Sequence, residues 1–293
     1  MTAESSMHAS WRLAVARTAA DAYAGNRRLA AFVVAGSVGA GLADEFSDLE
    51  LDCYWSEPPS DRDRLAPIES LGGRLEAFWD FDADDEEWSE DYRIGQLDVT
   101  VSNFTVGSVE RFIDAVTVDA DTDPVKHMRL AAIQRGLALQ GADLDAGWRD
   151  RAGAYPDALV LAMVEQSLAP GALPGWSARE AMISRGDEIA LHALLVAVER
   201  AVIGALLAVN RIYAPHRVFK WQRSLLAEFR IAPDRLAERL ASLWLAGTEA
   251  IEQAEALLAE TVVLAETVAG VDLAEFRAAL AERRAPVDPP GRA

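Results

Sequence analysis

The chain has 293 residues, of which 51% are hydrophobic, and its formal net charge is −19. This length suits two domains, while the charge argues against the basic surface on which nucleic-acid-binding proteins depend. No uninterrupted apolar run approaches the roughly 18 residues of a membrane span, and the N-terminus lacks the pattern of a secretory signal. Cys53 is the only cysteine, so no intramolecular disulfide can form, which fits a cytoplasmic protein.

Helices and strands alternate over the first 105 residues. Apolar residues at helical spacing predict a helix over 10–26, a short helix is expected after Ser37, and a capped helix ends near Leu71. Alternating apolar residues predict strands over 29–35, 49–55, 74–81 and 94–104. Between the last two strands, the acidic segment 82–91 is expected to form a hairpin loop. It is either a solvated charge run or a rim that attracts a polycationic acceptor.

From about residue 105 onward, nearly every segment has helical periodicity. Helices are predicted over 108–116, 126–139, 156–168, 178–213, 218–229, 233–245, 248–268 and 273–284. The pattern therefore predicts an α+β N-terminal domain, residues 1–122, followed by an all-helical bundle, residues 123–284. Residues 285–293 are rich in proline and are expected to be a disordered tail.

The most informative segment is 35–55. A Gly36-Ser37 turn follows an apolar run, and Asp48 and Glu50 stand two residues apart at the start of a strand. Alternation in a strand places these two carboxylates on one face, where they repel each other unless a cation neutralises them. Mg²⁺ prefers oxygen ligands and often joins carboxylates to substrate phosphates. Gly36 allows close backbone approach and Ser37 adds a hydroxyl, both at a helix N-terminus that favours phosphate.

These residues, taken in order, resemble the signature of the nucleotidyltransferase superfamily. This superfamily includes DNA polymerase β, the aminoglycoside and lincosamide nucleotidyltransferases and the small MNT proteins. Its signature is Gly-Ser, about ten residues, then acidic–hydrophobic–acidic, with a third acidic residue on a later strand. Gly36-Ser37 and Asp48-Leu49-Glu50 match the first two parts, and Asp98 in QLDVTVSNF best matches the third. The resemblance covers roughly the first 120 residues and implies a polymerase β-like domain with a mixed sheet.

Three other carboxylates compete for the first two metal positions: Asp44, Glu45 and Asp52. Asp52 is in phase with Glu50 and is the strongest competitor. Asp48 is preferred because Ser47-Asp48 stands where the Ser-Asp of the family begins the acidic pair.

The resemblance also implies roles for these residues. Asp48 and Glu50 would bind Mg²⁺ that bridges the phosphates of a nucleoside triphosphate, most simply ATP. Asp98 would bind a second metal ion or accept the proton of an acceptor hydroxyl. Gly36 and Ser37 would hold the outer phosphates.

Cations for the triphosphate are expected from the helical half, since the N-terminal half supplies mainly anions. The series RGDE, LLAVNRIYAP and KW, within residues 155–230, resembles a bacterial family of nucleotidyltransferase-like proteins whose helical C-terminal domain has no assigned function. Lys220 is the first candidate, and Arg185 and Arg211 are weaker ones. The alternative is that the arginines form structural ion pairs and that Lys220 is an ordinary surface residue.

The resemblance implies an Mg²⁺-dependent adenylyltransferase that moves AMP from ATP to a hydroxyl of a small acceptor. The negative charge favours a cationic acceptor, such as an aminoglycoside-like antibiotic, over tRNA or DNA, and antibiotic resistance in a bacterial cytoplasm would follow. Two alternatives stay open: a non-catalytic nucleotide-binding regulatory protein, and a protein AMPylase of toxin–antitoxin type. Acceptor identity, base preference and oligomeric state are open at this stage.

Overall fold

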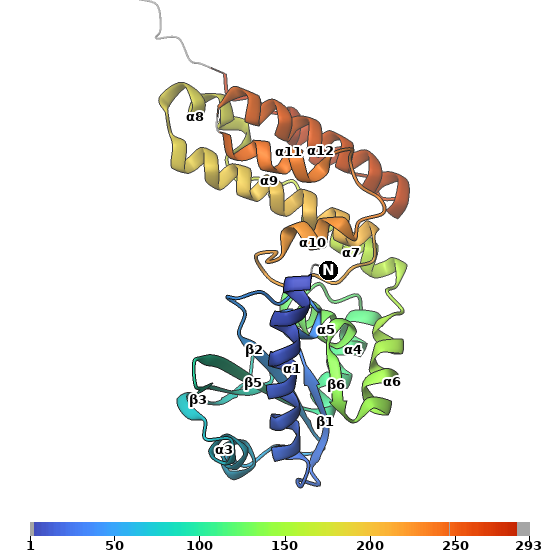
Figure 1. Ribbon diagram of the computed structural model, residues 1–293. Helices are drawn as coiled ribbons and strands as arrows, with labels where there is room; N and C mark the ends of the chain where they lie inside the picture. Colours follow the sequence, from blue (N-terminus) through green and yellow to red (C-terminus); the bar gives the residue numbers. More distant parts are fainter. Residues whose placement is uncertain (1–2, 246, 286–293) are drawn as a thin grey trace, which may run out of the picture. The chain divides into compact units, whose positions relative to one another are not determined.

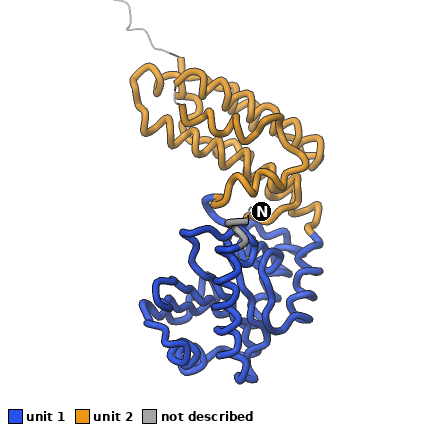
Figure 2. Tube along the Cα trace, viewed as in Figure 1, with its two compact units in different colours: residues 1–154, 215–218 blue, residues 155–214, 219–293 orange. Residues whose placement is uncertain are grey.

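The computed structural model describes residues 3–245 and 247–285, and its chain forms two compact units (Figure 2). Unit 1 comprises residues 1–154 and 215–218, and unit 2 comprises residues 155–214 and 219–293. Each unit has its own set of helices, and the carboxylates singled out in the sequence all belong to unit 1.

Unit 1 is built on a mixed six-stranded sheet with the order β3-β4-β5-β2-β1-β6 (Figure 1). The strands are β1 (Leu29–Val34), β2 (Leu49–Trp55), β3 (Arg74–Asp82), β4 (Glu87–Ile94), β5 (Leu97–Thr105) and β6 (Leu137–Gln140). Only β2 and β5 pair in parallel, and the other neighbours in the sheet are antiparallel. The α+β class and the mixed sheet expected from the sequence are therefore confirmed for unit 1.

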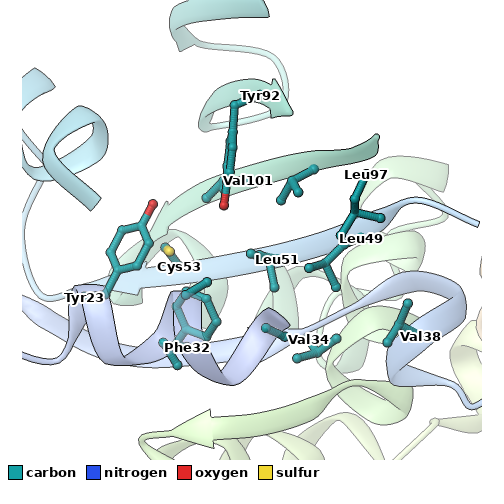
Figure 3. Close-up of a cluster of buried hydrophobic side chains, with 14 of the residues drawn as sticks. Tyr23, Phe32, Val34, Val38, Leu49, Leu51, Cys53, Tyr92, Leu97 and Val101 are labelled. Carbon is teal, nitrogen blue, oxygen red and sulfur yellow. The ribbon is translucent and has the colours of Figure 1, made fainter. Parts of the chain in front are cut away.

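Six helices accompany this sheet: α1 (Ala3–Tyr23), α2 (Gly36–Gly39), α3 (Asp61–Ser70), α4 (Val106–Thr117), α5 (Pro124–Arg135) and α6 (Ala142–Ala152). Helix α1 packs on one face, where Tyr23 lies against Phe32 with ring centroids 5.3 Å apart (Figure 3). On the opposite face, Trp148 of α6 packs edge-on against Tyr54 of β2. Burial of these aromatic rings between helix and sheet adds apolar stabilisation on both faces of the sheet.

Strand β2 alternates as its sequence predicts. Leu49, Leu51 and Cys53 are at most 1% exposed and belong to the core shared with α1 (Figure 3). Asp48, immediately before Leu49, and Glu50, between the two leucines, are exposed. The start of the strand thus presents its two carboxylates on the face opposite this core, whereas Asp52 and Tyr54, further along the same face, are buried.

The segment 82–91 differs from the expected acidic loop, because only residues 83–86 connect two strands and β4 begins at Glu87. The inward side of β4 carries Glu90 where an apolar residue was expected, which hid the alternation. Glu90 is fully buried and forms an ion pair with Arg64 of α3. Asn103 also donates to Glu90, at 2.8 Å. A buried carboxylate is tolerated here because cationic and amide partners satisfy it.

The segment 126–139 also differs from its prediction. Helix α5 ends at Arg135, and the next residues form β6, which pairs with β1 at the sheet edge. Helix α6 follows and was not predicted. The predicted domain boundary at 122/123 consequently falls inside unit 1, because α5, β6 and α6 belong with the sheet. The predicted tail, residues 285–293, lies outside the described residues except for Ala285.

Every regular element in the described part of unit 2 is a helix. They are α7 (Asp157–Ser167), α8 (Arg179–Arg185), α9 (Glu188–Val209), α10 (Gln222–Ala227), α11 (Leu236–Ser242), α12 (Thr248–Ala269) and α13 (Ala274–Ala281), with short 3-10 turns at Trp176–Ala178 and Leu243–Leu245. The single helix predicted over 178–213 is broken between α8 and α9, where Gly186 takes a φ of +69°.

Helix α9 is long and apolar enough to cross a membrane by length and composition. However, 56% of its most apolar window is buried inside the protein, where it packs against α7 and α12. These contacts are those of the central helix of a folded bundle.

Candidate functional site

The Gly-Ser turn directly abuts the second carboxylate of the motif. Gly36 opens α2 with a φ of +55°, and the backbone N–H of Ala35 donates to the carbonyl of Glu50 at 2.9 Å. A Cβ atom added at Gly36 would lie 2.5 Å from Cδ of Glu50, far inside van der Waals contact. Only glycine satisfies both requirements, so the turn and the Glu50 carboxylate form one local unit.

The backbone register places all three predicted carboxylates on one sheet face. In the parallel pair, Leu49 lies opposite Val99 and Glu50 lies opposite Thr100. Asp48 and Asp98 each precede one of these partners by one residue, so they stand at the same level. Neighbouring strands lie about 4.8 Å apart, which brings carboxylates from β2 and β5 within reach of one small cation.

The Asp98 carboxylate meets Arg93 instead of its acidic neighbours. Nε of Arg93 donates to Oδ1 of Asp98 at 2.6 Å, and this hydrogen bond raises the pKa of Arg93. Within residues 3–245 and 247–285, no group of three or more His, Cys, Asp or Glu side chains is arranged to hold a metal ion. A site using all three carboxylates would require Asp98 to leave Arg93. The metal assignment therefore stays a prediction.

Arg12 of α1 is a candidate positioning residue that the sequence reasoning missed. Its side chain is almost fully buried, with 3% exposed, and Nε donates to the carbonyl of Ser47 at 2.9 Å. Desolvation lowers the pKa of Arg12, against the opposing attraction of Asp44 and Asp48. The guanidinium thus anchors the loop immediately before Asp48. The sequence did contain a signal for this role, because Arg12 lies on the same helical face as Ala16 and Tyr23, where an apolar residue is expected.

The loop that Arg12 holds is itself a compact turn. Oδ1 of Asp44 accepts from the N–H of Phe46, and Oγ of Ser47 accepts from the N–H of Asp44, both at 3.0 Å. Such side-chain-to-backbone bonds order short loops. Asp44 is thereby engaged in building the loop that leads to Asp48.

Asp52, the strongest competitor of Asp48, is enclosed by the protein. It is 4% exposed and accepts a hydrogen bond from the Tyr54 hydroxyl at 3.1 Å. Burial raises its pKa, opposed by the nearby Arg129. An enclosed carboxylate of this kind is poorly placed for a solvent-exchanging metal ion, which favours Asp48 and Glu50.

The three predicted cations all belong to unit 2. Arg211 donates to the carbonyl of Tyr155 at 2.6 Å and pairs with Asp157, which matches the structural alternative for this residue. Arg185 is exposed at the end of α8. Lys220 is exposed in the turn before α10 and makes no hydrogen bond or ion pair with the residues that the structure describes.

Comparisons with known proteins locate one family match. Residues 124–222 match a domain of unknown function, DUF4037, and this stretch overlaps residues 155–230. Among solved structures, the chain is similar to a nucleotidyltransferase-like protein from Exiguobacterium sibiricum 255-15, with 12% identity and a TM-score of 0.39. That alignment covers 88% of this chain and 75% of the other. No curated protein matches the chain.

Proposed function

We propose that this protein is a metal-dependent nucleotidyltransferase whose centre lies where β1, α2 and β2 meet. The observation that carries the proposal is the close approach of Gly36 to Glu50, with Asp48 immediately before β2 and Asp98 on the parallel neighbour β5. The order and spacing of the same residues produced the resemblance to the superfamily. The proposal thus joins a sequence pattern to a backbone arrangement that suits it.

The donor set fits a hard divalent cation. Asp48 and Glu50 offer exposed carboxylate oxygens from one strand, and Asp98 stands at the same level on the next. Bound Mg²⁺ would neutralise charge on the triphosphate during nucleotidyl transfer. Gly36 lets the Glu50 carboxylate lie directly against the backbone of the turn, at the start of α2, where outer phosphate oxygens would be bound beside the metal ion. Asp98, once released by Arg93, would accept the proton of the acceptor hydroxyl.

Further parts of the proposal rest on charge. We propose ATP as the nucleotide and a small, hydroxyl-bearing cation as the acceptor, since a net charge of −19 repels nucleic acid. Lys220 is proposed to contact the triphosphate because it is exposed and unpaired among the described residues. A bacterial cytoplasm would provide the nucleotide, and modification of an aminoglycoside-like antibiotic is one activity of this chemical class.

One observation favours a second candidate function. The hydrogen bond between Arg93 and Asp98 occupies the group that would serve as base. A nucleotide-binding regulatory protein without transferase activity needs Asp48 and Glu50 but does not need a free Asp98. The two functions therefore differ in what Asp98 contributes.

Binding and turnover measured on matched variants test the proposal. Asp48→Asn and Glu50→Gln should abolish Mg²⁺-dependent ATP binding, measured by calorimetry, and should leave the melting temperature equal or slightly higher because repulsion is relieved. Glu69→Gln, an exposed carboxylate of α3, is the control and should bind as wild type. Unchanged ATP binding in both motif variants would contradict the proposal.

Asp98→Asn separates the two candidate functions. A transferase should bind ATP in this variant yet release no pyrophosphate with any acceptor that the wild type uses. A regulatory protein should show the same ATP binding and no pyrophosphate release even as wild type. Full turnover by Asp98→Asn would refute the assignment of Asp98 as base.

Lys220→Ala tests the proposed triphosphate contact. A charge-assisted contact contributes roughly 1.5–3 kcal/mol, so ATP affinity should fall about 10-fold or more while adenosine affinity stays the same. Arg200→Ala, which removes an exposed arginine of α9, is the control in the same unit and should bind ATP as wild type. Equal losses for ATP and adenosine would indicate a folding defect.

A further inference from the structure

Phe46 has the most exposed aromatic side chain in the described part of the chain. It is 88% exposed, whereas the next, Trp244, is 54% exposed. Phe46 lies in the loop between α2 and β2, two residues before Asp48. Single exposed apolar side chains are common on protein surfaces, so exposure alone assigns no role to this ring. Its setting in the loop distinguishes it.

The turn that carries Phe46 is ordered without any contribution from its ring. The backbone N–H of Phe46 donates to Oδ1 of Asp44 at 3.0 Å. Oγ of Ser47 also donates to Oδ1 of Asp44, at 3.0 Å, and accepts from the N–H of Asp44. Every residue except proline has a backbone N–H for the first of these bonds. The hydrogen bonds of the turn therefore do not explain why residue 46 is a phenylalanine.

A buried cation holds this turn from the side of the core. Arg12 is 3% exposed, and its guanidinium donates to the carbonyls of Glu45 at 3.4 Å and of Ser47 at 2.9 Å. These are the residues directly before and directly after Phe46. Enclosing a guanidinium is unfavourable unless its N–H groups are hydrogen-bonded, so the buried arginine needs both carbonyls. The two bonds fix the backbone on each side of Phe46 and leave its ring in solvent.

The Phe46 ring lies close to the proposed metal ligands. Two residues of extended chain span at most about 7 Å, so the Cα atoms of Phe46 and Asp48 are within that distance. A metal ion on Asp48 and Glu50 would hold phosphates, and the sugar and base of a nucleotide extend beyond these phosphates. Aromatic side chains stack on any base, because every base has a π face. An exposed ring on a fixed backbone beside the metal ligands suits that role.

We propose that Phe46 stacks on the base of the bound nucleoside triphosphate and that Arg12 positions it by holding Glu45 and Ser47. The identity of the ligand rests on the proposed function. Stacking depends on the area of the base and not on its hydrogen-bonding edge. Phe46 therefore favours purine over pyrimidine nucleotides and does not separate ATP from GTP.

Calorimetry in the presence of Mg²⁺ tests the stacking with two ligands, ATP and inorganic tripolyphosphate, which has the phosphates but no base. Phe46→Ala should weaken ATP binding about 5- to 150-fold, which corresponds to about 1–3 kcal/mol. Tripolyphosphate should bind this variant as tightly as it binds the wild type. UTP, which has a smaller base, should lose less affinity than ATP. Phe46→Trp should keep or raise the ATP affinity.

Phe46→Trp also provides a direct optical signal. Its emission is measured as the difference from wild type, because the chain has 8 tryptophans, and it should change when ATP and Mg²⁺ are added. Tripolyphosphate with Mg²⁺ should leave it unchanged. Ile189 of α9 is 89% exposed and provides the matched controls. Ile189→Ala should bind ATP as wild type, and the emission of Ile189→Trp should not respond to ATP.

Three results would overturn the proposal. In the first, Phe46→Ala binds ATP as tightly as the wild type. In the second, it loses ATP and tripolyphosphate affinity equally, which would mean that residue 46 acts on the loop and not on the base. In the third, Phe46→Ala changes the oligomeric state in size-exclusion chromatography and leaves ATP affinity unchanged, which would make the ring a contact between two copies of the chain.

Adenosine without Mg²⁺ separates this proposal from the proposed function. If adenosine binds the wild type but not Phe46→Ala, while ATP binding needs no Mg²⁺, the stacking stands and the metal-dependent function fails. If ATP with Mg²⁺ binds both proteins equally well, the stacking alone fails. If the wild type binds neither adenosine nor ATP, both proposals fail.

Discussion

Replacing Gly36 by alanine should damage metal and nucleotide binding far more than it damages the fold. The added Cβ would overlap the Glu50 carboxylate, lying 2.5 Å from its Cδ. Glu50 is exposed, so its side chain can rotate away from the new methyl group. The rotation relieves the clash and moves the proposed ligand out of position.

The change in the free energy of unfolding is the sum of three contributions. A left-handed backbone conformation costs an alanine about 1–2 kcal/mol, and Gly36 has a φ of +55°. Displacement of the Glu50 side chain destabilises the folded state by a further ~0.5–1.5 kcal/mol, the cost of an unfavourable rotamer. The alanine also lowers the conformational entropy of the unfolded chain, which stabilises the folded state by about 0.4–1 kcal/mol. The free energy of unfolding should therefore fall by about 1–2.5 kcal/mol, which lowers the melting temperature by about 2–10 °C. Loss of one charged ligand should weaken Mg²⁺-dependent ATP binding about 10- to 100-fold.

Gly72→Ala provides the matched control. Gly72 has a φ of +64°, and a Cβ there would meet nothing within 4 Å. Thermal unfolding should show a destabilisation for both variants, because both carry the same backbone strain, and a larger one for Gly36→Ala, because only this variant displaces Glu50. Calorimetric titration with ATP and Mg²⁺ should show a loss only for Gly36→Ala. Equal ATP affinity in the two variants would refute the coupling between Gly36 and Glu50.

Three further predictions concern residues around the centre. Arg12→Met should loosen the loop before the carboxylates and lower stability by about 1–3 kcal/mol, with weaker Mg²⁺ binding by calorimetry; unchanged Mg²⁺ affinity would leave the residue purely structural. Arg64→Met should cost about 3–5 kcal/mol in denaturant unfolding by stranding the buried Glu90, and adding Glu90→Met should recover part of that loss; no recovery would contradict the pairing. Burial raises the pKa of Asp63, but hydrogen bonds led by those from Ser60 outweigh it and lower this pKa to about 2. Its stabilisation is complete above the unfolded value near 4 and is lost as the pH falls through 2, so the stability difference between wild type and Asp63→Asn should shrink over that range, and a constant difference would exclude the linkage.

The local features of this chain could be predicted from its sequence. Strand β2 has the predicted bounds, 49–55, because alternating apolar residues at Leu49, Leu51 and Cys53 indicate a strand. The same alternation correctly predicted that Leu49 is buried and that Glu50 is exposed. The Gly-Ser turn was found because glycine marks backbone that other residues avoid. Each of these features depends on residues that are near one another in the chain.

Features that depend on distant partners were missed. Strand β4 was missed because a glutamate is expected at the surface, whereas Glu90 is buried through its ion pair with Arg64, 26 residues away, and its hydrogen bond from Asn103. Strand β6 was absorbed into a helix because a four-residue strand has no period of its own and is defined by pairing with β1.

Some features of the candidate site could be predicted from the sequence, and others depend on the tertiary structure. The sequence determined which carboxylates stand together on β2, because spacing along one strand sets their face. Tertiary structure decided that Arg12 anchors their loop, that the same side chain holds both neighbours of Phe46, and that Arg93 holds Asp98. Those contacts join residues that are distant in the sequence or belong to different strands. Hydrogen bonds and ion pairs depend on distances in space, which a single sequence does not record.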